Sequence, residues 1–375
     1  MCRCLAKRFL LLSLMTGLMV HMPADAVRWF DFKLSEQTKA RVKKASLGVF
    51  GFGALAWAGV RLWPHPNRNG SDHRAVKALG FDPCLTEYCK SGARTETAVV
   101  FAHGFGNQAI SSSDERVMSD VYTGVVFEFA DSRRFKPFGY RCANLGGEFD
   151  LRTLLYVLVR CREMGYKQIV LWGESRGGAT VLRALHALTK PRLYEKSWRA
   201  LGVLTESEDL DFVTIRELRK MVEMGRVILA QPLLSTHSVL RKMARDKVKC
   251  ATPRCCHSLI GPVNYVGHVV IEAVFAALTN YNPFIETPLV LLKDLAFTSK
   301  AENPQFSIFM TLRDQDGVIG NELDDEVIKL SAKMKNKSTV RLMVVKDPSA
   351  GTGFENHTNV KKATKYLQLI ASGLE

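Results

Sequence analysis

A serine in the setting of a nucleophile lies in the pentapeptide Gly-Glu-Ser-Arg-Gly at residues 173–177. The pentapeptide follows an apolar run at residues 167–172 and precedes a helical pattern. This is the context in which G-x-S-x-G forms a tight turn that presents a serine hydroxyl. Gly173 and Gly177 supply the small residues that such a turn requires beside the adjoining strand and helix. Because a serine hydroxyl is a weak nucleophile at neutral pH, Ser175 needs a nearby base and a third group that orients this base.

Short apolar runs and helical patterns alternate on both sides of this turn. Strands are predicted at residues 97–102, 123–129, 167–172, 200–205, 306–312 and 339–345, and helices at 151–163, about 178–188, 321–334 and from 360 to the end. Asp150 is expected to be the N-cap residue of the helix that follows it. Short apolar strands separated by helices indicate a mostly parallel sheet with helices on both faces. The predicted fold class is therefore α/β.

Residues 95–375 resemble an α/β-hydrolase, the superfamily of esterase-like and lipase-like serine hydrolases. The pentapeptide resembles the nucleophile elbow of that family, and the sequence His-Gly-Phe-Gly at residues 103–106 resembles the His-Gly turn after its third strand. The resemblance implies an α/β-hydrolase fold, a mostly parallel sheet flanked by helices. The family usually opens with an antiparallel strand pair, and the residues before 95 show little sign of one. A reduced sheet and an undetected hairpin both stay open.

The resemblance also implies the order of a catalytic triad, which in this fold runs serine, acid, histidine. Ser175 is then the nucleophile. Of the nine histidines, only His357 follows the late acidic loop, and it lies between the last predicted strand and the terminal helix, where the family places its base. Asp316 is the favoured acid, because two aliphatic residues stand at its second and third following positions, as in the family.

Other carboxylates compete with Asp316 for the role of the acid. Asp314 lies in the same loop after a predicted strand. Glu206 or Asp209 would serve if the acid followed the preceding strand, as it does in some relatives. The carboxylates that do not take this role are expected to be solvated loop charges.

Backbone N–H groups are the usual donors to an oxyanion in acyl transfer. By resemblance, these donors belong to Phe105 and Arg176. His103 and Gly104 are expected to shape the turn, and His103 is not expected to carry a proton. The charged side chains of Glu174 and Arg176 either contact the substrate or face the surface.

About a hundred residues separate the fourth and fifth predicted strands, far more than one crossover helix requires. We interpret residues 207–303 as an inserted helical cap. Its segment 263–279 is strongly apolar, and it places His268 and Glu272 one helical turn apart on one face. Either this segment lines an acyl pocket, which would favour lipid-like esters, or it packs on the domain.

The N-terminal region carries two hydrophobic signals. Residues 1–26 have the three regions of a signal peptide, or form a first hydrophobic anchor. Residues 27–63 combine a basic group with an apolar stretch, 45–63, that is just long enough to span a bilayer or is instead a buried helix. Cleavage after residue 26 would leave the basic group outside, against the positive-inside rule. Membrane association through the export pathway is expected, with the side of the membrane open, and residues 64–94 are interpreted as a linker.

The net charge of +15 is spread along the chain without a recognition helix or an aromatic-basic motif, so nucleic-acid binding is not expected. Nine cysteines include a cluster at residues 250–256, next to His257, but no second pair of ligands completes a zinc pattern. We expect ordinary thiols or, in an extracytoplasmic domain, one disulfide, either Cys84 to Cys89 or one within the cluster at residues 250–256. Neither a metal nor a cofactor is predicted.

These features predict a serine hydrolase that forms an acyl-enzyme and hydrolyses carboxylic ester or thioester bonds of small-molecule or lipid-like substrates. A peptidase and an acyltransferase would use the same triad. A binding or scaffold protein with a hydrolase-like fold is the alternative without catalysis, and the complete Ser, Asp and His set argues against it.

Overall fold

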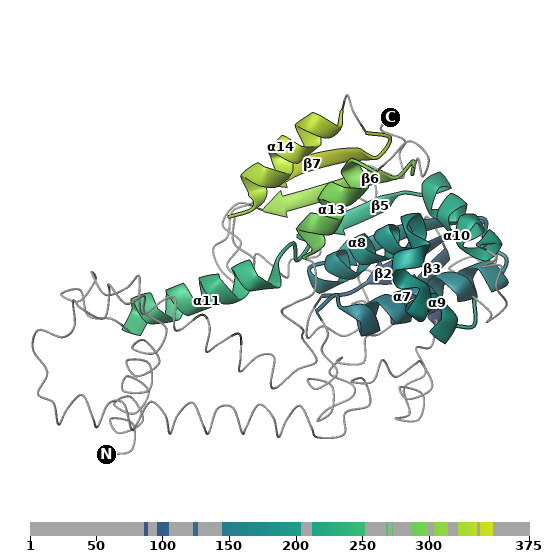
Figure 1. Ribbon diagram of the computed structural model, residues 1–375, viewed down its shortest axis with the longest axis horizontal. Helices are drawn as coiled ribbons and strands as arrows, with labels where there is room; N and C mark the ends of the chain where they lie inside the picture. Colours follow the sequence, from purple (N-terminus) through teal and green to yellow (C-terminus); the bar gives the residue numbers. More distant parts are fainter. Residues whose placement is uncertain are drawn as a thin grey trace, which may run out of the picture. The chain divides into compact units, whose positions relative to one another are not determined.

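Figure 1 shows the computed structural model, which describes residues 86–88, 96–104, 123–126, 145–203, 212–251, 268, 272, 287–298, 304–313, 322–335 and 338–347. The chain divides into two compact units. The sheet unit comprises His65–Thr236 and Thr279–Glu375, and the second unit comprises Met1–Pro64 and His237–Leu278. The candidate nucleophile Ser175 belongs to the sheet unit.

A seven-stranded sheet forms the centre of the sheet unit. In spatial order its strands are β1 (Thr86–Tyr88), β3 (Thr123–Val126), β2 (Thr97–Ala102), β4 (Gln168–Glu174), β5 (Val227–Ala230), β6 (Ser307–Arg313) and β7 (Arg341–Asp347). All neighbouring strands are parallel except β1, which pairs antiparallel with β3. The predicted mostly parallel α/β sheet is confirmed. Strand β1 lies within the segment interpreted as a linker, so the sheet begins before residue 95 and includes one antiparallel strand.

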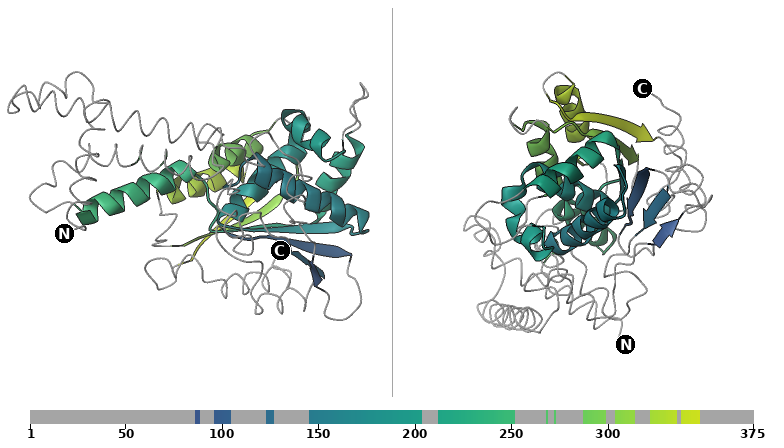
Figure 2. Two further views of the ribbon diagram at one scale, coloured as in Figure 1. Left: turned by 90° about the horizontal axis from the view of Figure 1, so that it is seen from below. Right: turned by 90° about the vertical axis from the view of Figure 1, so that its right-hand side faces the viewer.

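Helices flank this sheet. The sheet unit contains α7 (Glu148–Glu163), α8 (Arg176–Thr189), the short 3-10 helix η2 (Pro191–Tyr194), α9 (Glu195–Ala200), α10 (Val213–Met224), α13 (Pro288–Ala296) and α14 (Asp324–Met334). Helix α11 (Thr236–Ala251) lies almost wholly in the second unit. Figure 2 shows α7, α8 and α10 on one face of the sheet, and α8 contacts β2, β4 and β5.

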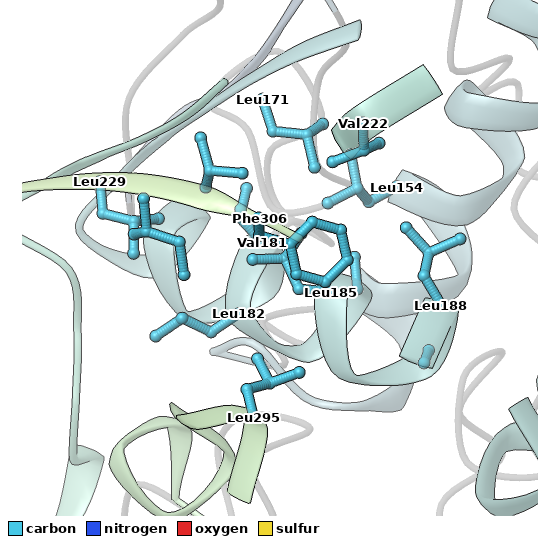
Figure 3. Close-up of a cluster of buried hydrophobic side chains, with 14 of the residues drawn as sticks. Leu154, Leu171, Val181, Leu182, Leu185, Leu188, Val222, Leu229, Leu295 and Phe306 are labelled. Atoms are coloured by element: carbon cyan, nitrogen blue, oxygen red, sulfur yellow. The ribbon is translucent and has the colours of Figure 1, made fainter. Parts of the chain in front are cut away.

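The main core fills the space between the sheet and α8. Leu171 of β4 and Leu229 of β5 face Val181 and Leu185 of α8, and Phe306 joins the same cluster (Figure 3). All residues of α8 are buried. Apolar residues two apart in a strand share a face of the sheet, which explains why the alternating strand positions meet this helix.

The opposite face of the sheet is also buried. Val99 and Phe101 of β2 and Trp172 of β4 are each at most 3% exposed, and the rings of Phe101 and Trp172 meet edge to face at 4.6 Å. Strands buried on both faces explain the nearly continuous apolar runs from which the sheet was predicted.

The strand predicted at residues 200–205 is wrong over residues 200–203, and residues 204 and 205 lie outside the described part of the chain. Helix α9 ends at Ala200, and its buried Trp198 anchors the apolar run. The chain then turns through Gly202 at φ 71°, where the N–H of Gly202 binds the carbonyl of Arg199 and the N–H of Val203 binds that of Trp198. These two bonds form a Schellman turn, which terminates a helix at a glycine of positive φ.

The next strand after β4, both along the chain and in the sheet, is β5, which follows α10. Residues 213–230, which were assigned to the inserted cap, thus contribute α10 and β5 to the sheet unit. The long connection between consecutive strands starts after Ala230 and ends before Ser307, and it includes α11 and α13.

The predicted signal peptide and the apolar stretch 45–63 lie outside the described residues. Within the described part of the chain, no helix combines the length and apolarity that a membrane span requires.

Candidate active site

Ser175 occupies the turn between β4 and α8 with φ 50° and ψ −113°. Non-glycine residues rarely adopt positive φ, because the side chain approaches its own backbone, and such strain persists only where the surroundings fix it. Here the N–H of Ser175 donates to the carbonyl of Ala230 at 3.0 Å, and its carbonyl accepts from the N–H of Leu233 at 2.8 Å. The backbone therefore holds the serine in the conformation expected of a nucleophile elbow.

The two glycines of the pentapeptide leave no room for a side chain. A Cβ atom on Gly177 would lie 1.8 Å from the carbonyl oxygen of Ala102 in β2. A Cβ atom on Gly173 would lie 2.7 Å from the backbone of Gly177 and Gly178. The requirement for glycine at these positions thus comes from the contact of α8 with the strands below it.

The turn stands at the carboxyl edge of the parallel strands. Ser175 follows the end of β4 and binds Ala230 at the end of β5. The next residue, Gln231, donates its N–H to the carbonyl of Thr311 near the end of β6. Ligands of open α/β sheets bind at this edge, where the loops that follow the strands meet.

His103 and Gly104 follow the end of β2, beside the elbow. The register of β2 with β4 pairs Ala102 with Gly173. His103 is 1% exposed, and its Nδ1 lies 2.8 Å from the carbonyl oxygen of Gly104. Burial and the nearby Arg176 lower the pKa of His103 to about 4, against the opposing effects of Gly104 and Asp150. The imidazole is thus neutral at pH 7, and it donates from Nδ1 to stabilise the turn.

Arg176 is completely buried and forms a bidentate ion pair with Asp150 of α7. Its Nε and one terminal nitrogen each lie 2.8 Å from a carboxylate oxygen. Glu174 is buried as well, at 7% exposed. Of the two alternatives for these elbow charges, exposure at the surface is wrong, and the guanidinium of Arg176 is turned into the protein.

Asp150 is not the N-cap of α7. The cap position belongs to Gly147, and the Asp150 carboxylate accepts from the N–H of Gly146 at 2.8 Å as well as from Arg176. Sequence reasoning missed this role. The available signals were an acidic residue in the first turn of one helix and a basic residue in the first turn of the next.

Several predicted site residues lie outside the described part of the chain, namely Phe105, Asp316, His357 and the alternative acids Asp314, Glu206 and Asp209. Two findings bear on them. Strand β6 ends at Arg313, so Asp314 follows it directly. Glu206 and Asp209 do not follow a strand in the way that was expected, because residues 195–200 are helical.

A hollow of about 810 Å³ lies beside α14 and the edge strand β7. Its lining includes Gln305 and Ser307 at the start of β6, together with Arg341 at the start of β7. Ser175 stands at the opposite, carboxyl edge of the sheet. The hollow therefore lies away from Ser175.

Comparisons with solved structures return esterase-like proteins at low similarity. A lipase-esterase related protein from Clostridium acetobutylicum is 13% identical, with 76% of this chain and 98% of that one covered and a TM-score of 0.40. An esterase of Pyrococcus furiosus is 13% identical, with coverage of 79% and 93% and a TM-score of 0.41. A butyrate-bound esterase of Thermogutta terrifontis is 14% identical, with coverage of 77% and 88% and a TM-score of 0.42. No protein-family model and no curated protein matches the sequence.

Proposed function

We propose that this protein is a serine hydrolase that forms an acyl-enzyme on Ser175. The observation that carries the proposal is the positive-φ turn of Ser175 between a central parallel strand and a buried helix. A strained serine in this position is costly for folding and presents its hydroxyl at the edge of the sheet where ligands bind. At similarities this low, the function rests on the residues of this chain itself.

The proposed base and acid follow strands that end at the same edge. Asp316 comes three residues after the end of β6, and His357 comes ten residues after the end of β7. Strands β6 and β7 are parallel neighbours, so the loops that leave them start side by side. This placement supports the assignment of Asp316 as the group that orients His357, and of His357 as the base for Ser175.

In the proposed reaction, the Ser175 hydroxyl attacks the carbonyl carbon of an ester or thioester and passes its proton to His357. The backbone N–H groups of Phe105 and Arg176 stabilise the oxyanion. His357 then protonates the leaving alcohol or thiol as its bond to the carbonyl carbon breaks. Water, activated by the same histidine, attacks the acyl-enzyme and releases the acid and free Ser175.

Labelling with a fluorophosphonate probe tests the proposal directly. We expect strong labelling of the parent chain and loss of labelling in Ser175→Ala and His357→Ala. Ser197→Ala is a matched control, because Ser197 is a buried serine of α9 that has no proposed role in the reaction, and labelling should persist in it. Labelling that survives in Ser175→Ala would refute the nucleophile.

Lipid-like esters are the proposed substrate class, on the basis of the apolar segment 263–279 and the hydrophobic N-terminal region. A series of aryl esters of increasing acyl length measures this preference as kcat/KM. A maximum at the shortest acyl chains would count against lipid-like substrates without affecting the acyl-enzyme mechanism.

Membrane association through residues 1–63 is proposed from the sequence alone. Fractionation with salt and detergent extraction tests it. Complete release from membranes by high salt would exclude a spanning anchor.

A further inference from the structure

Three side chains of metal-binding types come together within the second unit. His237 lies on α11, and His268 and Glu272 are helical residues one turn apart. Their potential ligand atoms all lie within 4.8 Å of one another. The pairing of His268 with Glu272 was evident from their spacing, but the contribution of His237 from another helix was not.

Two nitrogen-to-oxygen distances in this cluster match the spacing of ligands around one ion better than that of direct hydrogen bonds. Nδ1 of His237 and Nε2 of His268 each lie 3.4 Å from the same oxygen of Glu272, Oε2. Hydrogen bonds from nitrogen to oxygen usually measure about 2.7–3.2 Å. Two ligand atoms bound to a tetrahedral zinc ion at about 2.0–2.1 Å are separated by about 3.3 Å. Both nitrogens therefore stand at the spacing of neighbouring zinc ligands from the carboxylate oxygen.

The Nε2 atom of His268 provides a second, independent observation. His268 is 5% exposed, and its Nε2 is buried without a hydrogen-bond partner among the described residues. Buried polar atoms are nearly always paired, and an unpaired one requires an explanation. This atom points toward Glu272 and lies in the cluster, so a bound cation would satisfy it.

The two imidazole rings lie against each other. Their rings meet edge to face, with centroids 4.3 Å apart and an angle of 87°. Burial, and then the neighbouring His237, lower the pKa of His268, while Glu272 opposes the shift.

We propose that His237, His268 and Glu272 bind a zinc ion that links α11 to the helical residues 268 and 272. Two imidazoles and one carboxylate favour zinc or a similar transition metal over calcium or magnesium, which prefer oxygen ligands. Three protein ligands leave a fourth tetrahedral position for water. The site is independent of the acyl chemistry proposed for Ser175.

One nearby charge opposes the ion. Arg241 lies one turn beyond His237 on α11, and its positive charge acts on His268 in the same direction as His237 does. Removal of this charge should strengthen cation binding. Arg241→Gln is therefore expected to raise the affinity for zinc, a result that misfolding of the variant would not produce.

Zinc binding to the full-length chain tests the proposal, measured by isothermal titration after treatment with a chelator. The thiols at residues 250–256 also attract zinc, so the measurement is made in parallel in a Cys250→Ser, Cys255→Ser, Cys256→Ser background. We expect one zinc ion per chain in the background, where these thiols are absent. His237→Ala in the background should weaken binding roughly tenfold or more.

His237 is the appropriate ligand to change, because its side chain is 54% exposed and its loss should leave the fold intact. A circular dichroism spectrum checks this, and Glu272→Gln provides a second ligand variant. In the background, Arg241→Gln should bind zinc more tightly than its parent. Absence of zinc binding in the background, or unchanged affinity in both ligand variants, would overturn the proposal.

Discussion

The guanidinium of Arg176, the residue after the candidate nucleophile, is clamped by both carboxylate oxygens of Asp150 at 2.8 Å, and neither side chain is exposed. This pair ties the first turn of α8 to the first turn of α7. Arg183 of α8 reinforces the connection, because its Nε donates to the carbonyl of Gly146 at 2.7 Å. The elbow is therefore stabilised by a buried polar network between α7 and α8 as well as by apolar packing.

Truncation of one partner of this pair should be strongly destabilising. Asp150→Ala leaves the guanidinium of Arg176 buried without its counter-charge, and we expect the free energy of unfolding to fall by about 3–5 kcal/mol. The measurement is urea denaturation followed by circular dichroism.

The matched control for this prediction is Arg160→Ala, on the same helix α7. Arg160 pairs with Glu163 at the surface, where both side chains are 45% exposed. Exposed pairs of this kind contribute about 0–1 kcal/mol. Similar losses in Asp150→Ala and Arg160→Ala would contradict the importance of the buried pair.

The close contact of Gly177 with β2 predicts a severe effect of a single methyl group. In Gly177→Ala the new Cβ would overlap the carbonyl oxygen of Ala102, so α8 must move away from the sheet. We expect loss of at least about 3 kcal/mol of stability, together with loss of fluorophosphonate labelling.

Gly165→Ala separates this steric effect from backbone strain. Gly165 has φ 86°, but a Cβ there would meet nothing within 4 Å. Its cost should be about 1–2 kcal/mol, with labelling retained. An equal cost for the two substitutions would show that the contact with Ala102 is not decisive.

The buried neutral His103 predicts a component of acid sensitivity. Its pKa is about 4 in the folded protein and about 6.5 when unfolded, so the unfolded state takes up a proton first. The contribution of His103 to the free energy of unfolding is fully present above pH 6.5 and decreases as the pH is lowered toward 4. Below pH 4 it no longer changes. The total loss is about 3 kcal/mol.

His103→Asn should lack this component. The free energy of unfolding, measured by denaturant titration between pH 7 and 4, should fall less steeply in the variant than in the parent. Parallel curves for the two proteins would indicate that His103 has the same pKa in the folded and unfolded states.

The two aspartates after β6 can be separated by their effect on catalysis. Asp316→Asn should lower kcat on an aryl ester about 10³–10⁴-fold, because the carboxylate proposed to orient His357 is lost. Asp314→Asn should retain kcat within about threefold. The opposite result would assign the acid to Asp314 and leave Ser175 and His357 in place.

The elements around the candidate site were predictable where periodicity and local signals agreed. The elbow strand and its helix, and the late strands β6 and β7, appear within two residues of their predicted bounds, because each is a compact apolar run next to a clear turn. The strand predicted at residues 200–205 failed because the apolar run after the buried Trp198 has neither the periodicity of a helix nor that of a strand. Short runs do not distinguish a strand from the end of a helix.

The contacts that fix the site could not be read from the sequence. Asp150 and Arg176 are 26 positions apart, and each has a plausible local role, one as a helix cap and the other as a surface charge. Only the packing of α7 against α8 makes them partners. The same holds for His237, whose neighbours His268 and Glu272 come from another helix.

Helix α8 has no exposed residue along its whole length, from Arg176 to Thr189. Ser175, the N-cap residue of this helix, is therefore attached to an element that cannot move without disrupting the core. Amide protons in the middle of this helix should exchange with solvent only through global unfolding. In the proposed hydrolase, adaptation to different substrates has to arise outside this helix, so specificity can vary while the proposed nucleophile keeps its place.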